Sequence, residues 1–364
     1  MKKTIINIFF QLLRYSIGAS EEFPSELSPE MWNDIYEIAR QQSLLGVLFY
    51  GIQKQIESKP PRDLLLKWYA ISEQIRKANE KTNQVACELT RNLWTDGFRS
   101  CILKGQGNTL NYPNPYIRMS GDIDIWVEGG TDVVLPFARR YFRCSKACYH
   151  HVDAGAYQGV EIEVHYRPSF MNNLIYNGRL QRWFTEQAEE QFSHEVELPD
   201  EAGKICVPTN SFNIISQLVH IYNHVIHEGI GLRQLVDYYF LLKAKNDNRQ
   251  QTTDHRELAA TLQYLGLYKI ATAVMWVLKE TLGLEKEYLI VPSNERLGRF
   301  LLDEILQGGN FGQYDARVKH GGSQLSRNVQ RLKRDLRLLR YFPSECLWEP
   351  VFRVYHFFWR LFHR

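Results

Sequence analysis

Two aspartates separated by a single residue open a short apolar segment. Asp122 and Asp124 alternate with apolar residues that continue to Val127. Because the side chains of a β-strand alternate between its two faces, both carboxylates are expected on one face. Their Cα atoms would lie about 6.5–7 Å apart, close enough for the carboxylates to share one or two divalent cations. Without a cation, mutual repulsion would raise one of the two pKa values.

A second acidic segment repeats this pattern later in the chain. Glu161, Glu163 and His165 alternate with apolar residues, so they too are expected on one strand face. If the two strands are neighbours, their carboxylates converge, and such hard oxygen ligands suit Mg²⁺ or Mn²⁺. The alternative is an exposed strand edge that carries acidic side chains, but Asp122 and Asp124 stand in an otherwise apolar strand. We therefore predict that the catalytic and metal-binding residues are Asp122, Asp124 and Glu163.

A glycine-containing turn precedes the first acidic strand. The tetrapeptide from Lys104 to Gly107 follows the apolar residues 100–103 and comes before an expected short helix at 106–111. Glycine lets a backbone approach a ligand closely, and Lys104 would add a cation for phosphate. Taken alone, the turn also fits an ordinary connection between a strand and a helix.

Further phosphate contacts are expected from the residues just before the aspartates. Arg118 offers forked donors that suit phosphate oxygens, and Ser120 adds a hydroxyl. The alternative for both residues is solvation of a loop. We predict that a phosphate-bearing ligand is bound by Lys104, Gly105, Gln106, Arg118, Ser120 and Gly121.

Three histidines lie on one face of an expected helix farther along the chain. His220, His224 and His227 have the spacing i, i+4 and i+7. No Glu forms a His-Glu-x-x-His frame with them, so a polar helix face lining the cleft is favoured over a metal site. Arg233 and Asp237 are also four residues apart and are expected to form a helix ion pair.

Three regions of the sequence must position these residues. Residues 1–97 are expected to be helical, with a break at Pro60-Pro61. Residues 98–168 predict a small α/β unit, and residues 169–364 a mainly helical domain. The elements expected first are a helix at 63–95, strands at 100–103 and 122–127, helices at 106–111 and 132–142, strands at 147–153 and 160–166, and a turn at 154–156. Those expected later are strands at 195–198 and 204–207, and helices at 210–227, 231–245, 255–265, 268–282, 324–340 and 348–363.

The composition says more about where in the cell the protein is located than about what it does. The chain has 364 residues with 44 Lys and Arg against 41 Asp and Glu, a balance that argues neither for nor against nucleic acid. None of the six cysteines forms a Cys-x-x-Cys pair, as expected of reduced thiols in a cytoplasmic protein. The basic and apolar start predicts an amphipathic helix rather than a signal peptide. No run of 18 apolar residues exists, so no stable membrane insertion is expected.

The C-terminal residues are aromatic and basic. The segment 340–364 fits three interpretations, namely a core helix, an acceptor-binding surface or a membrane-surface helix, and of these we favour packing within the core. A denser group of basic residues leaves open the hypothesis of an RNA or another anionic partner. That group consists of Arg327, Arg331, Lys333, Arg334, Arg337 and Arg340.

The order of these motifs resembles a known family. The motifs are Leu103-Lys104-Gly105, the loop Tyr112–Pro115, Arg118, the segment Gly121–Val127 and the segment Glu161–Tyr166. Together they resemble the polymerase-β-like nucleotidyltransferase superfamily, and more narrowly the bacterial family known as uncharacterised nucleotidyltransferases. The resemblance is strong over residues 98–168 and weaker around 217–220 and 232–238.

The resemblance implies that Asp122 and Asp124 hold metal and that Glu163 supplies the third carboxylate. It also implies that Lys104-Gly105 occupies the position of the superfamily's phosphate-binding Gly-Ser turn. In addition, we expect His165 on the acidic face and His220 on the later helix to contact the nucleotide. Because Lys-Gly-Gln replaces Gly-Gly or Gly-Ser in the turn, a catalytically inactive nucleotide- or partner-binding module of the same fold is a second hypothesis.

We predict an α/β plus α fold, in which a small mixed nucleotidyltransferase sheet is flanked by N-terminal helices and a larger C-terminal helical region. The expected reaction is in-line attack of an acceptor on the α-phosphate of a nucleoside triphosphate, with Mg²⁺ or Mn²⁺ as cofactor. The acceptor (a small molecule, a protein or RNA) and the oligomeric state stay open. A toxin- or resistance-type enzyme that modifies tRNA, protein or a small molecule is a third hypothesis. A carboxylate-pair hydrolase fits less well, because it needs its acid and base on opposed faces of a cleft.

Overall fold

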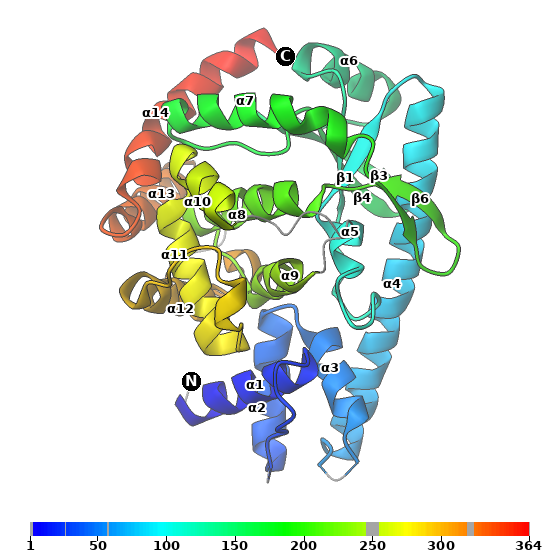
Figure 1. Cartoon of the computed structure of the whole chain (residues 1–364), viewed down its shortest axis with the longest axis vertical. Coiled ribbons are helices and arrows are strands. Elements are labelled where there is room, and N and C mark those ends of the chain that lie inside the picture. The colour runs from blue at the N-terminus through cyan, green and yellow to red at the C-terminus, as the bar shows by residue number, and fades with distance from the viewer. Residues whose placement is uncertain (1–2, 26, 57, 245–254, 319–323, 364) are drawn as a thin grey trace.

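The structure is a computed structural model and describes residues 3–25, 27–56, 58–244, 255–318 and 324–363. Helices surround a small sheet, as the predicted α/β plus α class requires (Figure 1). Lys245 and Arg364, which belong to predicted segments, lie outside the described residues, as does the side chain of Arg327.

Four helices form the N-terminal region. They are α1 (Lys3–Ser16), α2 (Pro29–Gln41), α3 (Leu45–Lys54) and α4 (Arg62–Thr95). Helices α2 and α3 are separated by a turn at Ser43, whose φ of 56° lies outside the helical range. Helix α4 runs along one side of the molecule from the N-terminal helices to the sheet (Figure 1). It follows Pro61 and ends before Gly97, whose φ is 87°, so the long helix was predicted correctly to within one residue.

The sheet has four strands in the order β1-β2-β4-β3. They are β1 (Ser100–Leu103), β2 (Ile123–Val127), β3 (His151–Tyr157) and β4 (Val160–His165), with α5 (Gly105–Thr109) and α6 (Thr131–Tyr141) between them. The pair β2 and β4 is parallel, whereas β1–β2 and β3–β4 are antiparallel. The two strands with the acidic patterns are therefore neighbours in the sheet.

Strand β3 differs from the prediction. It starts at His151 rather than at 147, and it continues through residues 154–156, where a turn was predicted. The register against β4 shifts between Asp153 and Ala156, and Gly155 has a φ of 72°. A bulge of this kind accommodates the glycine within the strand, so the Ala-Gly-Ala sequence does not end it.

Both faces of the sheet are covered. Ile123, Ile125 and Val127 of β2 pack in a cluster that includes side chains of α4 and α6. Trp126 points to the opposite face and packs in a larger cluster, where its ring lies near those of Phe192 and Phe212. The alternation inferred from the sequence holds, but the face that carries Asp124 is covered by helices rather than exposed to solvent.

The C-terminal region supplies those covering helices. It begins with α7 (Leu174–Gln191) and a hairpin of β5 (Glu195–Leu198) and β6 (Gly203–Cys206). The helices that follow are α8 (Asn210–His227), α9 (Leu232–Lys243), α10 (His255–Tyr264), α11 (Tyr268–Val277) with a π-helical turn at Leu278–Leu282, α12 (Glu295–Gly308), α13 (Gln324–Leu339) and α14 (Pro343–Phe362). One apolar cluster joins α1–α3 to α8–α12. Within the described part of the chain, no helix combines the length and apolarity needed to cross a bilayer.

Candidate active site

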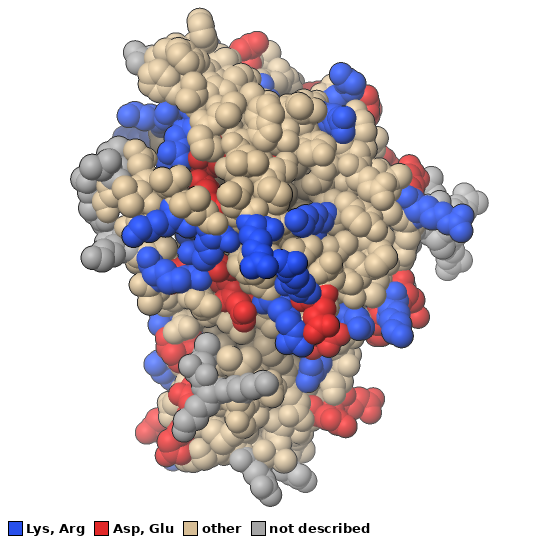
Figure 2. Space-filling model, turned by 90° about the vertical axis from the view of Figure 1, so that its left-hand side faces the viewer, with Lys and Arg blue, Asp and Glu red and all other residues tan. Residues whose placement is uncertain are grey.

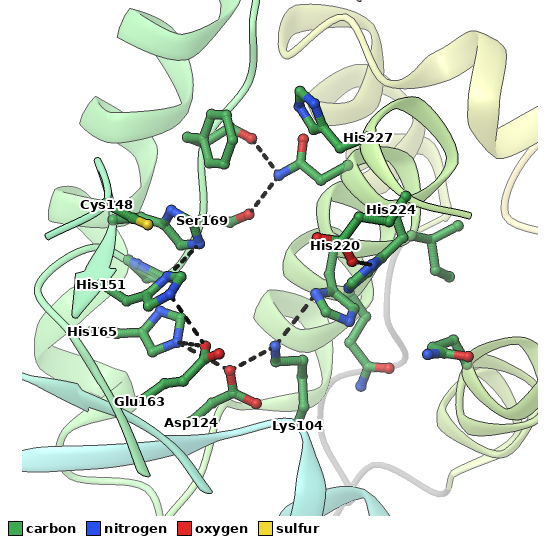
Figure 3. Close-up of a pocket in the computed structure, with 18 of the residues that line it drawn as sticks. Lys104, Asp124, Cys148, His151, Glu163, His165, Ser169, His220, His224 and His227 are labelled. Carbon is green, nitrogen blue, oxygen red and sulfur yellow. Dashed lines mark hydrogen bonds and ion pairs between the residues drawn. The ribbon is translucent and has the colours of Figure 1, made fainter. Parts of the chain in front are cut away.

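A pocket of about 660 Å³ lies between the sheet and the C-terminal helices (Figure 3). The sheet and its loops contribute one wall, with Lys104, Asp122, Asp124, His150, His151, Glu163 and His165. The helices and the loop after α12 contribute the opposite wall, with Gln217, His220, His224, His227, Arg233, Gln234, Asp237, Phe311, Arg331, Glu349, Phe352, Arg353 and His356. The acidic residues therefore face a wall rich in histidine and arginine.

The register of the parallel strands brings two carboxylates together. Asp124 of β2 is the direct partner of Glu163 of β4, and both side chains project into the pocket (Figure 3). His165 follows two residues after Glu163 and is only 2% exposed. Its Nε2 lies 3.0 Å from Oδ1 of Asp124 and 3.3 Å from Oε2 of Glu163. These three residues, on adjacent strands, form the centre of the site.

His165 carries a positive charge at neutral pH. Burial alone would lower its pKa, but hydrogen bonds to Asp124 and Glu163 outweigh burial and raise the pKa to about 9. Its second ring nitrogen, Nδ1, lies 3.2 Å from the carbonyl oxygen of Arg167. Both ring nitrogens thus face acceptors, as a doubly protonated imidazolium requires.

Lys104 supplies the second positive charge. Its Nζ lies 2.8 Å from Oδ1 of Asp124 and 3.3 Å from Nδ1 of His220. Burial opposes the charge of Lys104, but attraction by Asp124 and Glu163 prevails and the pKa of the ammonium is raised. The pKa of His220 is well below its usual value, because the ring is buried and Lys104 is close. His220 is therefore neutral, and its Nδ1 accepts a hydrogen bond from the ammonium.

The backbone at Lys104 is strained. Its φ of 54° and ψ of −134° lie in a region that side-chain-bearing residues rarely adopt, and Gly105 follows with a φ of 36°. Strain of this kind costs about 1–3 kcal/mol and persists where the surroundings enforce it. Here the ion pair with Asp124 holds the side chain of Lys104 toward the carboxylates.

Asp122 lies just before β2 and lines the pocket. The charge of Asp124, burial and the charge of Glu163 together raise the pKa of Asp122 to about 6. The pKa of Asp124 is instead well below its usual value, because Lys104 and His165 outweigh the effect of its burial. The pKa of one aspartate is therefore raised and that of the other is lowered, although they are only two residues apart.

The donor atoms fit a divalent cation. Ligand atoms of Asp124, Glu163 and His165 all lie within 4.8 Å of one another, and His151 and Asp153 make a similar group with Glu163. The carboxylates suit Mg²⁺ or Mn²⁺, whereas His165 would have to lose a proton before its imidazole could bind the cation. Among the described residues, Asp122 is not in such a tight group.

Arg118 lines the pocket, but its fork is occupied. Its Nε and Nη2 each lie 2.8 Å from an oxygen of Asp237, and both side chains are almost fully buried. The hydroxyl of Tyr112 donates to the same carboxylate at 2.6 Å. The helix ion pair between Arg233 and Asp237 is therefore replaced by a pair that joins the loop before β2 to α9. Arg233 instead donates through Nη1 to the carbonyl oxygen of Met119, at 3.1 Å.

Two further predicted residues turn away from the pocket. Gln106 is buried and donates through Nε2 to Asn83 of α4. The hydroxyl of Ser120 lies 3.1 Å from that of Thr82, also on α4. Gly105 and Gly121 do line the pocket. The turn and the loop are thus anchored to α4 by the side chains that were expected to bind the nucleotide.

Several lining residues were not predicted from the sequence. Arg233 is 8% exposed. Its burial, and to a lesser extent repulsion by the nearby Arg118, lower the pKa of its guanidinium to about 10. His150 and His151 lie beside His165, and the adjacent pair of histidines was the one available signal in the sequence. Phe311 comes from the loop after α12 and carried no signal at all. His224 and His227 line the pocket as the favoured interpretation of α8 proposed.

Comparisons with known proteins identify one sequence family. The family described as uncharacterised nucleotidyltransferase matches residues 28–283. A crystal structure of an antigenic nucleotidyltransferase-like protein from Paracoccidioides brasiliensis is similar to 60% of this chain and 96% of that chain, at 11% identity and a TM-score of 0.30. No curated protein matches the sequence.

Proposed function

Because this chain belongs to the family of uncharacterised nucleotidyltransferases, we propose that it is a metal-dependent enzyme that transfers a nucleoside monophosphate from a nucleoside triphosphate to an acceptor. The catalytic and metal-binding residues in this proposal are Asp122, Asp124 and Glu163. The observation that carries it is the parallel register of Asp124 and Glu163 on adjacent strands, both facing the pocket. The six free cysteines support the cytoplasmic location inferred from the sequence.

The reaction is an in-line displacement. An acceptor oxygen forms a bond to the α-phosphorus, the bond from that phosphorus to the bridging oxygen breaks, and pyrophosphate leaves. A bound Mg²⁺ or Mn²⁺ held by the carboxylates supplies stabilisation of the negative charge on the phosphates. One of the carboxylates, or a water, takes the acceptor's proton in this proposal.

Cationic residues orient the triphosphate. Lys104 lies beside the carboxylates, and the backbone of Gly105 is accessible from the pocket. Arg233 lies on the opposite wall, and its Nε has no hydrogen-bond partner among the described residues. These positive groups would hold the phosphates while His220 keeps the Lys104 ammonium in position.

A labelled-nucleotide assay tests the proposal. Each nucleoside triphosphate, labelled in its γ-phosphate, is incubated with the protein and Mg²⁺ or Mn²⁺, and release of labelled pyrophosphate is measured with cell extract as the source of acceptor. Asp124→Asn and Glu163→Gln should abolish release. Glu161→Gln is the matched control, because Glu161 lies on the same strand but is exposed and outside the pocket. Equal release by wild type and Asp124→Asn would refute the proposal.

One observation keeps a second function in view. Lys104 already forms an ion pair with Asp124, as expected of a module that binds a ligand without a cation. Such an inactive module would bind nucleotides without metal and release no pyrophosphate. Calorimetric titration with each nucleotide, with and without Mn²⁺, separates the two functions.

A further inference from the structure

Helices α13 and α14 expose an unusual amount of apolar surface. Of the twenty large hydrophobic side chains exposed among the described residues, eleven lie on these two helices. On α14 they are Leu347, Val351, Val354, Tyr355, Phe357, Phe358, Leu361 and Phe362, and on α13 they are Val329, Leu332 and Leu336. Single exposed hydrophobic residues are normal, but a concentration on one helix pair marks an interaction surface.

The inner face of α14 accounts for its packing. Phe352 and Trp359 are buried and contact the ring of Tyr149 beside the sheet. Glu345 accepts hydrogen bonds from the backbone of Asn172 and Asn173, which fixes the start of the helix. The exposed apolar residues occupy the other side, with spacings of three or four between Leu347 and Leu361. The second apolar face is therefore not needed to hold the helix in place.

The charges on the two helices have one sign at the surface. Residues 324–363 contain three acidic residues, Asp335, Glu345 and Glu349, and all three are buried. Apart from Arg331, which lines the pocket, the basic residues of the two helices include Lys333, Arg340 and Arg360, which are exposed. Figure 2 shows this side of the molecule, with a broad uncharged area above a belt of Lys and Arg side chains. The two helices therefore expose apolar and cationic side chains, which complement an anionic and apolar partner.

We propose that α13 and α14 dock on the surface of an anionic lipid bilayer, with the outer face of α14 in the interface. Amphipathic helices bind in this way when apolar and aromatic side chains enter the boundary between headgroups and acyl chains, while Lys and Arg contact anionic headgroups. In this proposal the attachment is peripheral, with α14 lying along the interface. The inference concerns a surface outside the pocket and does not depend on the proposed reaction.

A second copy of the chain fits this surface less well. In a symmetric dimer the same patch of both copies is in contact, so the exposed arginines of one copy would approach those of the other. No exposed acidic residue on α13 or α14 is available to compensate. An anionic lipid surface has no such penalty, and it accommodates the whole length of α14.

Vesicle flotation with the full-length protein tests this inference. Two vesicle types are used, phosphatidylcholine alone and an equimolar mixture with phosphatidylglycerol. The wild type should float with the anionic vesicles and be released by high salt, since electrostatic attraction is screened. Phe358→Asp and Leu361→Asp should each reduce the bound fraction by about tenfold or more. Arg360→Glu should weaken binding to the anionic vesicles alone.

The controls exclude loss of folding and general effects of added charge. Ile175→Asp places the same charge on an exposed apolar residue of α7 and should float like the wild type. Thermal melts verify that each variant is folded. Absence of wild-type binding to anionic vesicles overturns the inference. So does a wild-type dimer in light scattering that Phe358→Asp converts to a monomer, since the surface would then join two copies.

Discussion

The ammonium of Lys104 lies 2.8 Å from Oδ1 of Asp124, the carboxylate at the centre of the two acidic strands. The same oxygen accepts a hydrogen bond from His165 at 3.0 Å. A divalent cation that binds Asp124 must therefore compete with two positive charges already in contact with it. Lys104 is in this sense both a phosphate-binding group and a competitor for the metal site.

Lys104→Met should consequently have opposite effects on metal and on nucleotide. Without the ammonium, Mn²⁺ alone is expected to bind about tenfold more tightly, because Asp124 and Glu163 lose a competing cation. The rate of nucleotidyl transfer should fall by about 10²–10³-fold, since the phosphates lose their contact with the positive charge of Lys104. Electron paramagnetic resonance of Mn²⁺ and steady-state kinetics measure the two effects. Lys81→Met, at an exposed site on α4, should change neither, and unchanged Mn²⁺ affinity in Lys104→Met would show that the ammonium does not compete.

The pair of Arg118 and Asp237 predicts a large effect on stability. Both side chains are almost fully buried, so Arg118→Met leaves a carboxylate without its partner and should cost about 3–5 kcal/mol. Urea denaturation measures the loss, and the double variant Arg118→Met/Asp237→Leu should recover part of it. Arg99→Met is a suitable control, because Arg99 also binds carboxylates, but those of Glu128 and Glu189 are solvent-exposed. That variant should lose about 1 kcal/mol or less.

The same variant tests the predicted contact between Arg118 and the triphosphate. A folded Arg118→Met protein with wild-type stability and weakened nucleotide binding would favour that role over the structural one.

Local periodicity predicted the elements that carry the carboxylates. The bounds of β1 and α8 agree with the prediction, and alternation along β2 and β4 placed Asp124, Glu163 and His165 on one face. This succeeds because a strand with one apolar face leaves little freedom of register. The convergence of the two strands then followed from their position in one sheet.

Contacts between distant segments could not be predicted in this way. The pairing of Arg118 with Asp237 depends on how α9 packs beside the loop before β2, and no local pattern encodes that geometry. The contribution of α14 to the pocket is a further example, since Arg353 and His356 reach it from a helix whose Phe352 packs against Tyr149. The bulge in β3 was missed because an Ala-Gly-Ala sequence is also typical of a turn.

Two histidines at the far side of the pocket predict a loss of stability in acid. Burial lowers the pKa of both His227 and His356 to about 4. In the unfolded chain a histidine has a pKa of about 6.5, so the unfolded state takes up protons first as the pH falls. The stability is therefore fully present above pH 6.5 and declines between pH 6.5 and about 4, by at most about 1.4 kcal/mol per pH unit for each group.

His356→Phe should make this decline shallower. The measurement is the free energy of unfolding by urea at several pH values across that window. His194→Gln is the control, since His194 bonds the carbonyl oxygen of Val207 outside the pocket. An unchanged slope in His356→Phe would mean that this imidazole is protonated in the folded protein over the same range.

The N-terminal helices position the loop before the aspartates through one close contact. A Cβ atom at Gly46 of α3 would lie 2.3 Å from the carbonyl oxygen of Ile117, the residue before Arg118. Gly46→Ala must therefore displace the backbone of this loop, at a cost of about 1–3 kcal/mol. Because the loop leads directly into Asp122, the rate of nucleotidyl transfer should fall together with the melting temperature. Gly178→Ala is the matched control, because its added methyl group on α7 meets nothing within 4 Å. It should raise the stability by up to about 1 kcal/mol, since alanine favours a helix over glycine, and leave the rate unchanged. A Gly46→Ala protein with reduced stability but full activity would show that α3 supports the fold without controlling the geometry of the site.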